Sequence, residues 1–182
     1  MSSVPALPAA LDPPPGTTRL RAGRLNLEPL AGRHVDAVHR LFQNPEVARY
    51  LLDGAPVSRD WVAEAVRQSS ADFRGGGLGV WAAVGNGRLV GIAGWRVFFA
   101  DRGAELFYAF DPLTRGHRMV STTVRALCHY ALEARGEARV LASVDPPNRA
   151  SSRVLERCGF RFQARERRFG APNDLYGLDR KA

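Results

Sequence analysis

Apolar residues recur along this chain with two different periods, and the changes between them predict alternating strands and helices. Residues 24–30 alternate apolar and polar side chains, as a half-buried strand does. Two further apolar runs, 79–84 and 89–98, flank Asn86-Gly87, a dipeptide typical of a tight hairpin turn. We expect the remaining strands at about 104–110, 139–144, 160–168 and 174–179.

Apolar residues spaced three or four positions apart predict helices between these strands. One helix ends at Asn44-Pro45, a second begins near Ser58, a long one spans about 117–135, and a short one starts at Asn148. We expect these residues to face the core: Val35, Val38, Leu41 and Phe42; Trp61, Val62, Ala65 and Val66; Val120, Val124, Leu127, Ala131 and Leu132; and Ala150, Val154, Leu155 and Cys158.

The order of these elements predicts one α/β domain over residues 19–182 with a mixed, mostly antiparallel sheet. The strands up to residue 110 follow one another through short turns, which indicates an antiparallel meander. The helix at 117–135 then leads to a parallel strand at 139–144 through a right-handed crossover. Residues 1–18 are rich in Ala and Pro and lack the pattern of a signal peptide, so we expect a disordered arm.

The amino-acid composition restricts the class of protein. The chain has 182 residues, 45% of them apolar, which is enough for one core. We expect a soluble protein, because no apolar run approaches the ~18 residues of a membrane-spanning helix. Cys128 and Cys158 lie on predicted apolar helix faces, which suits free thiols and a cytoplasmic location. The histidines form no ligand pattern, so we expect no metal site.

The chain is strongly basic, with 26 Lys and Arg against 18 Asp and Glu and a net charge of +8. Lys181 is the only lysine. Such a balance favours polyanionic partners, among which nucleic acid is a candidate. The arginines are scattered from Arg19 to Arg180 without a sustained basic run, and no aromatic-interleaved nucleic-acid motif is present. A basic nucleic-acid-associated domain is therefore the less favoured interpretation.

Residues 148–160 combine a polar helix start with a helix stop. Asn148 and Ser151 place a carboxamide and a hydroxyl in the first turn, and Cys158-Gly159-Phe160 closes the helix. One interpretation is structural, because Asn is a preferred N-cap and Gly a preferred left-handed residue after a helix. The other is that this first turn belongs to a reaction site. The segment alone is compatible with both.

Residues 104–127 contain a candidate anion site. An apolar strand, a loop stopped by Pro112 and an Arg115-Gly116 turn lead into the long helix. The first turn of a helix presents free N–H groups and the positive end of its dipole, and therefore binds phosphate readily. Arg115 and Arg118 would add positive charge. An Arg-Gly pair is also common as simple punctuation before a helix, so both interpretations stay open.

Together, in this order, the two segments resemble the GNAT acyltransferase superfamily, and within it the RimJ/RimL-like N-terminal acetyltransferases. The resemblance covers most of the chain and rests on collinear motifs: Arg24 to Leu30, His34 to Leu41 and Asn44 to Leu51 as the opening strand and helices; Glu105-Leu-Phe-Tyr108 with Pro112 as the central strand; Arg115-Gly116 as the pyrophosphate loop; and Asn148, Ser151 and Gly159-Phe160 as the C-terminal motif. It implies a GNAT-like sheet splayed at its centre, helices on both faces, and acetyl-CoA or another acyl-CoA in the gap.

The pyrophosphate loop departs from the family pattern Arg/Gln-x-x-Gly-x-Gly/Ala. Arg118 and Val120 stand at its second and third key positions, and Thr122-Thr123 replace the family's Glu-Ala. An arginine can still offer its backbone N–H and adds a guanidinium that pairs with phosphate. We therefore interpret the segment as a variant cofactor loop. The alternative is a degenerate GNAT-fold protein that binds without catalysis.

The resemblance also implies roles for residues. Glu105 would deprotonate an attacking amine, although an exposed glutamate at a strand start is its plain alternative. Ser151, positioned by Asn148, would donate to the departing CoA thiolate, because the last helix contains no tyrosine. The cofactor would contact Phe107, Tyr108 and Phe110 on the strand; Arg115, Gly116, His117, Arg118, Met119, Val120 and Ser121 in the loop and the first helical turn; and Asn148 and Ser151.

The implied activity is transfer of an acetyl or other short acyl group to a primary amine, either a peptide or protein N-terminus or a small amine. The acceptor pocket would be built by the region around residues 44–80, with Asp53, Asp60, Trp61 and Trp81 as candidate lining residues. A succinyl group is also compatible with arginine-rich walls. A homodimer is compatible with the sequence.

Overall fold

The computed structural model describes residues 13, 16–51, 54–75, 78–99, 103–114, 118–168 and 170–181. Its strands are β1 (Leu20–Ala22), β2 (Leu25–Pro29), β3 (Val80–Gly85), β4 (Arg88–Phe99), β5 (Gly103–Phe110), β6 (Arg139–Val144), β7 (Arg161–Arg168) and β8 (Ala171–Asp179). Its helices are α1 (Val35–Phe42), α2 (Pro45–Ala48), α3 (Arg59–Gly75), α4 (Met119–His129) and α5 (Arg149–Arg157), with 3₁₀ turns η2 (Gly32–His34) and η4 (Pro112–Thr114) and a π-helical turn η5 (Tyr130–Ala134).

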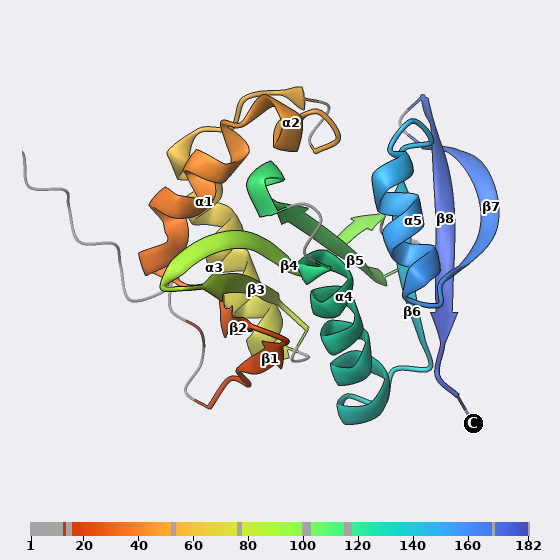
Figure 1. Ribbon diagram of the computed structural model, residues 1–182, viewed down its shortest axis with the longest axis horizontal. Helices are drawn as coiled ribbons and strands as arrows, with labels where there is room; N and C mark the ends of the chain where they lie inside the picture. The colour runs from red at the N-terminus through yellow and green to blue at the C-terminus, as the bar shows by residue number, and fades with distance from the viewer. Residues whose placement is uncertain are drawn as a thin grey trace, which may run out of the picture.

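All eight strands belong to one sheet in the order β1-β2-β3-β4-β5-β6-β8-β7 (Figure 1). Every neighbouring pair is antiparallel except β5 and β6, as the sequence predicts. Among the residues that the structure describes, the parallel pair has one ladder position, Glu105 opposite Leu141. Beyond it β5 stays paired with β4, and β6 with β8. The mixed sheet is therefore splayed at its centre, which confirms the fold expected from the family resemblance.

Helices cover both faces of this sheet, and each face has its own core (Figure 1). Alternation along β3 divides its side chains, because Val80 and Ala82 pack with α1 and α3, whereas Trp81 and Ala83 pack with α4. Trp81 is fully buried. Its ring makes edge-to-face contacts with the rings of Phe73, Trp95 and Tyr130, at centroid distances of 4.7, 5.8 and 5.5 Å. Trp81 is therefore a core residue and does not line an acceptor pocket.

Most of the side chains expected in the core are buried, but two are displaced around their helices. Ala150 is exposed, because the inward stripe of α5 runs through Leu155 and, one turn earlier, through Ser152. Trp61 is 40% exposed, because the stripe of α3 is centred on Val62 and Val66. Its ring packs at the rim against Phe42, with centroids 6.3 Å apart. The inward stripe thus begins one position after Trp61 in α3 and two positions after Ala150 in α5.

The ends of the elements follow the turn chemistry of the sequence. Asn86 and Gly87 adopt left-handed backbone angles, φ 49° and 72°, at the β3–β4 turn, as the Asn-Gly pair predicts. Gly159 has φ 95° after α5 and ends it as expected. Most of the proposed arm, residues 1–18, lies outside the described residues. Within it, the carbonyl of Thr18 accepts a hydrogen bond from the Trp81 indole N–H at 2.9 Å.

A buried histidine makes the N-terminal layer sensitive to acid. His34 is 7% exposed, and its Nδ1 accepts a hydrogen bond from the Ala31 N–H at 3.1 Å. Burial, with the nearby charge of Arg33, lowers the pKa of His34 from 6.5 to about 4. The unfolded chain therefore binds a proton at this side chain in a pH range where the folded chain does not.

We expect the free energy of unfolding to fall as the pH drops from 6.5 to 4, with His34 contributing up to about 3 kcal/mol of the loss. Above pH 6.5 this contribution is fully present. His34→Asn keeps an acceptor for the Ala31 N–H but cannot titrate, so it should flatten this part of the profile. Urea unfolding at pH 4, 5, 6 and 7 measures the difference. Identical slopes for the wild type and the variant would show that His34 is not the titrating group.

Candidate active site

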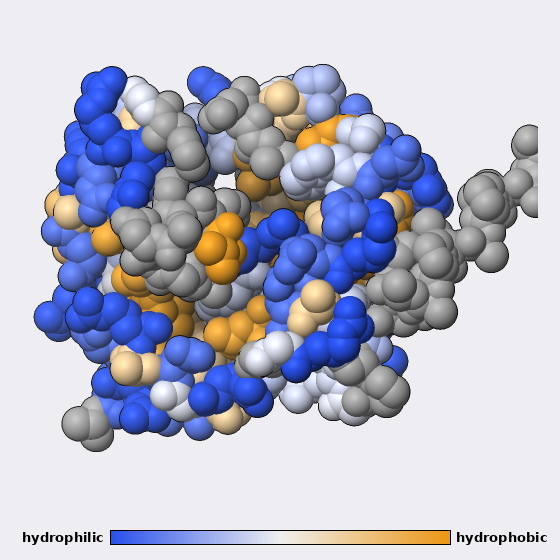
Figure 2. All heavy atoms as spheres, turned by 180° about the vertical axis from the view of Figure 1, so that it is seen from behind, coloured by the Kyte–Doolittle hydropathy of each residue, from blue (hydrophilic) through white to orange (hydrophobic). Residues whose placement is uncertain are grey.

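The divergence of β5 from β6 creates a wedge at the centre of the sheet. Leu106 to Phe110 continue the β5 ladder with β4, and Ala142 to Val144 continue the β6 ladder with β8. Among the described residues, no ladder position after Glu105 joins the two strands. Seen from behind, the surface is hollowed between the C-terminal strands and the N-terminal half, with apolar side chains inside the hollow (Figure 2). The wedge therefore offers a strand-like backbone edge to an extended ligand.

Two helix starts lie at the open end of this wedge. Parallel strands end at the same edge of a sheet, and here β5 leads through η4 into α4 while β6 leads into α5. The first helical bond of α4 runs from the Thr122 N–H to the Arg118 carbonyl. The N–H groups of Met119, Val120 and Ser121 therefore precede the helical ladder. Such groups, with the helix dipole, favour an anion.

Arg118 takes the position where the family has glycine and also takes the glycine conformation. Its φ of 56° and ψ of 6° are left-handed, and it forms the N-cap of α4 without a side-chain cap. The exposed Arg118 side chain and the half-buried Met119, Val120 and Ser121 thus form the described part of the predicted cofactor loop. Arg115, Gly116 and His117, predicted to belong to the same loop, lie outside the described residues.

Asn148 and Ser151 occupy the first turn of α5 as predicted. The Asn148 Oδ1 accepts a hydrogen bond from the Ser151 N–H at 3.2 Å, so Asn148 does cap the helix. The Ser151 side chain is half-buried. The backbone carbonyl of Ser151 accepts a hydrogen bond from the Tyr108 hydroxyl at 3.2 Å. The cap therefore fixes Ser151 beside a side chain of β5, across the wedge.

Tyr108 brings a hydroxyl to the start of α5, although the sequence predicts it only as a cofactor contact. The last helix contains no tyrosine, and Tyr108 reaches α5 from the neighbouring strand. Tyr108 shares a sheet face with Leu106 and Phe110, which also pack toward α4 and α5. Burial raises the pKa of Tyr108 well above its usual value of 10.0, so the hydroxyl keeps its proton at neutral pH.

Glu105 is fully buried at the closed end of the wedge, rather than exposed at the start of a strand. It stands opposite Arg96 in the β4–β5 ladder, and strand alternation places both side chains on the face covered by α3. The Arg96 guanidinium donates to the Ala65 carbonyl of α3 at 3.5 Å. The sequence does not predict that Arg96 lies beside Glu105, because this position depends on the register between β4 and β5.

The helices α4 and α5 are tied together along one wall of the wedge. The Arg125 guanidinium donates to the Arg157 carbonyl at 2.9 Å, and the Cys158 thiol donates to the Ser121 carbonyl at 3.4 Å. Burial raises the pKa of Cys128 to about 12 and also raises that of Cys158, so both thiols stay protonated and poorly nucleophilic. These contacts join α4 to the C-terminal end of α5, and the wall offers no thiolate nucleophile.

The described residues contain no group of three or more His, Cys, Asp or Glu side chains that could hold a metal ion. No helix in this part of the chain is both long and apolar enough to cross a membrane. Of the other candidates for an acceptor pocket, Asp60 and Trp61 are exposed at the start of α3. Asp53 lies outside the described residues.

Comparison with known proteins agrees with this geometry. The sequence model of the family described as "Acetyltransferase (GNAT) domain" matches residues 24–161, which include β5, α4 and α5. The chain belongs to the GNAT acetyltransferase family. This GNAT chain is 26% identical over 159 residues to FsC-acetyl coenzyme A-N(2)-transacetylase from Aspergillus fumigatus, a match covering 77% of the chain and 63% of the fungal protein. It is also 26% identical to the uncharacterized protein YkkB of Bacillus subtilis, over 87% of the chain and 94% of that protein.

Solved GNAT structures share the fold at lower sequence identity. The ribosomal L7/L12 alpha-N-protein acetyltransferase RimL in complex with coenzyme A has a TM-score of 0.77 and 17% identity, over 89% of this chain and 98% of RimL. A GNAT-family acetyltransferase from Bacillus anthracis has a TM-score of 0.75 and 19% identity, over 90% of this chain and 99% of that one. At these identities the likeness shows the GNAT fold.

The left-handed Arg118 allows a test of the cofactor loop without any ligand. A non-glycine residue in this conformation costs about 1–2 kcal/mol, so Arg118→Gly should raise the free energy of unfolding by about 1 kcal/mol. Ser121→Gly, in the first helical turn, is the control and should lower it by about 1 kcal/mol. Urea unfolding of the three proteins measures both. A loss of stability in Arg118→Gly equal to that in the control would contradict the left-handed assignment.

Proposed function

We propose that this GNAT protein is an acyl-CoA-dependent N-acetyltransferase that transfers an acetyl group to a primary amine. The observation that carries the proposal is the wedge between β5 and β6, with the starts of α4 and α5 at its open end. GNAT structures with the same fold include RimL with coenzyme A and the self-immunity acetyltransferase MccE with acetyl-CoA. Two unpaired cysteines fit a reducing, cytoplasmic setting.

The residues around the wedge fit an acyl-CoA in shape and charge. The first turn of α4 would bind the pyrophosphate through the N–H groups of Met119, Val120 and Ser121, and the Arg118 guanidinium would add a charged contact. Phe107, Tyr108 and Phe110 would line the extended part of the molecule along β5. Backbone N–H groups on this edge would hold the thioester oxygen, where a fixed donor stabilises developing negative charge better than reorienting water does.

Three side chains would act on protons. Glu105 is our candidate base for the attacking ammonium, and because it is fully buried it would act through a water that enters with the substrate. Of Ser151 and Tyr108, which meet across the wedge, one hydroxyl would give the departing thiolate its single proton and the other would donate a hydrogen bond to the sulfur. Asn148 positions Ser151 through the helix cap. Arg96, opposite Glu105, would orient the carboxylate.

For the acceptor we propose a peptide or protein N-terminal amine or a small amine. The printed names of similar proteins describe N-acetylation: the fungal relative is an N(2)-transacetylase, and RimL is an alpha-N-protein acetyltransferase. Direct transfer holds amine and thioester together, and such proximity can contribute about 7–11 kcal/mol in the best-oriented cases. The acetyl group is the acyl group that these similar proteins use, and it is the one to test first.

The proposal predicts that the purified protein releases coenzyme A from acetyl-CoA only when an amine is present. A thiol-release assay with a panel of N-terminal peptides, polyamines and amino sugars, followed by mass spectrometry of the product, tests this. Saturating dependence on both acetyl-CoA and one amine is the expected result. Binding of acetyl-CoA without turnover on any amine would favour a degenerate GNAT-fold binding protein, and salt-sensitive binding to nucleic acid alone would favour the nucleic-acid alternative.

Matched variants in the same assay separate the two hydroxyls. We expect Ser151→Ala and Tyr108→Phe each to lower kcat by about 10- to 100-fold with little change in KM for acetyl-CoA, because each removes a proton donor. Tyr176→Phe is the control, since Tyr176 is buried on β8 and outside the wedge. An unchanged kcat in either variant would remove that hydroxyl from the mechanism.

A further inference from the structure

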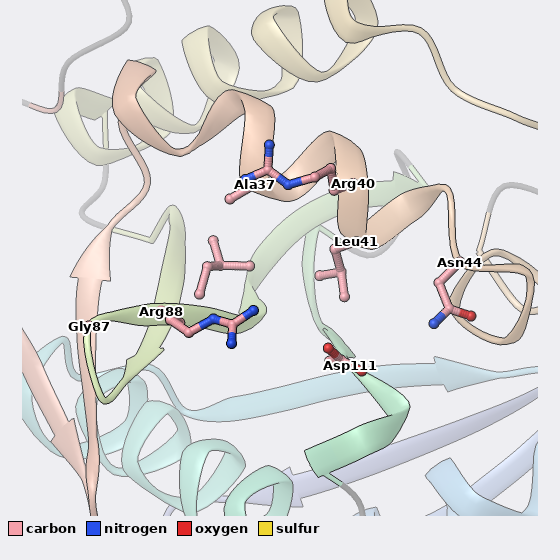
Figure 3. Close-up of a pocket in the computed structure, with 8 residues that line it drawn as sticks. Ala37, Arg40, Leu41, Asn44, Gly87, Arg88 and Asp111 are labelled. Atoms are coloured by element: carbon pink, nitrogen blue, oxygen red, sulfur yellow. The ribbon is translucent and has the colours of Figure 1, made fainter.

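A pocket of about 440 Å³ lies under α1 on the face of the sheet opposite α4 (Figure 3). Its walls come from three segments that are distant in sequence. Arg40, Leu41 and Asn44 belong to α1 and its end, Arg88 and Leu89 to the start of β4, and Asp111 to the end of β5. The pocket has the size of a small-molecule site, and none of the residues assigned to catalysis or to the cofactor lines it.

The pocket carries more positive than negative charge, because Arg40 and Arg88 line it together with one carboxylate, that of Asp111. Within the part of the chain that the structure describes, the guanidinium groups of Arg40 and Arg88 form no hydrogen bond or ion pair. Asp36, one turn before Arg40, is engaged by Arg59 at 2.7 Å instead. Figure 3 shows Arg88 extending from the hairpin and Arg40 lying along α1 beside the same space. Two unpaired guanidiniums at one cavity attract an anion.

The backbone holds the polar groups of the pocket in place. Arg88 directly follows the left-handed Asn86-Gly87 pair, so the direction of the strand at that residue is fixed by a tight turn. The Asp111 Oδ1 accepts a hydrogen bond from the Leu113 N–H at 3.0 Å, and the Asn44 Oδ1 accepts one from the Glu46 N–H at 3.0 Å. These bonds orient a carboxylate and an amide before any ligand binds.

Apolar surface separates the charged groups. Leu41 is 8% exposed and belongs to the core of the α1 layer, and the half-buried Leu89 packs against the same core. A ligand in this space would therefore meet guanidiniums, an apolar floor, and the acceptor atoms of Asp111. Arg40 and Arg88 are exposed, so the apolar floor formed by Leu41 and Leu89 is what distinguishes this space from a solvated charged face.

We propose that this pocket binds a small organic anion. Its phosphate or carboxylate group pairs with Arg40 and Arg88, its apolar body lies on Leu41 and Leu89, and a hydroxyl or amine donates to Asp111. The proposal does not rest on acyl transfer, because the pocket and the wedge are built by different residues. Asp111 immediately precedes η4, which leads toward α4, so a ligand here would contact the base of the segment that carries the cofactor loop.

NMR titration of the full chain with three probes tests the site: inorganic phosphate, phenyl phosphate and phenylacetate, each with and without saturating coenzyme A. We expect saturable shifts of the Gly87 and Asp111 amides, with at least one phenyl-bearing anion binding more tightly than inorganic phosphate. Arg88→Gln and Arg40→Gln should each weaken the binding of that phenyl-bearing anion by roughly ten- to a hundredfold. Leu89→Ala should weaken the phenyl probes but not inorganic phosphate.

Arg180→Gln is the matched control, because Arg180 is an exposed arginine near the C-terminus, outside the pocket. It should leave all affinities unchanged. The comparison of phenyl phosphate with phenylacetate identifies the anionic group. Three results would each overturn the proposal: no saturable shift of the two amides with any probe, equal weakening in Arg180→Gln, or full displacement of the probes by coenzyme A. If coenzyme A does not bind, the comparison of Arg40→Gln and Arg88→Gln with Arg180→Gln still tests the pocket. That result would count against the acetyltransferase proposal alone.

Discussion

The pairing of β5 with β6 at one ladder position, Glu105 opposite Leu141, is the constraint on which the site depends. Strands in a sheet normally satisfy each other's backbone groups along their whole length. Here β4 and β8 hold the two strands on their outer sides, so the inner edges diverge without loss of the sheet. The wedge is therefore bordered on both sides by paired strands. It presents to a ligand the backbone groups that a continuous sheet would use internally.

The cores on the two faces of the sheet stabilise the strands where β5 and β6 diverge. Alternation along β3 and β5 sends neighbouring side chains to opposite layers, so each strand is anchored by α1 and α3 on one face and by α4 on the other. Gly91 adds to this anchoring, because the Phe110 ring lies against its backbone where a Cβ would come within 2.6 Å. The contacts of Arg125 and Cys158 then fix α4 against α5. The position of α4 beside α5 therefore depends on contacts outside the β5–β6 wedge itself.

Periodicity and turn chemistry predicted most of the fold, whereas the site depended on pairing in space. The Asn86-Gly87 hairpin, the strand at Arg139–Val144 and the stop at Gly159 have local signals, and they occur as expected. The N-cap that Asn148 forms for α5 could also be predicted, because it too has a local sequence signal. The closeness of Tyr108 to Ser151 and of Arg96 to Glu105 could not, since it arises from residues 43 and 9 positions apart brought together by the sheet. The left-handed Arg118 was likewise invisible, because the residue type disfavours that conformation.

The most direct test of the account is hydrogen–deuterium exchange of the protein with and without acetyl-CoA. If the wedge holds the cofactor, the amides of Leu106 to Phe110 in β5 and of Met119 to Ser121 in α4 should exchange more slowly when acetyl-CoA is bound. Exchange in the β7–β8 hairpin should be unchanged. Saturable binding of acetyl-CoA with no protection in β5 and α4, or with protection only elsewhere, would contradict the central claim that this wedge is the acyl-CoA site.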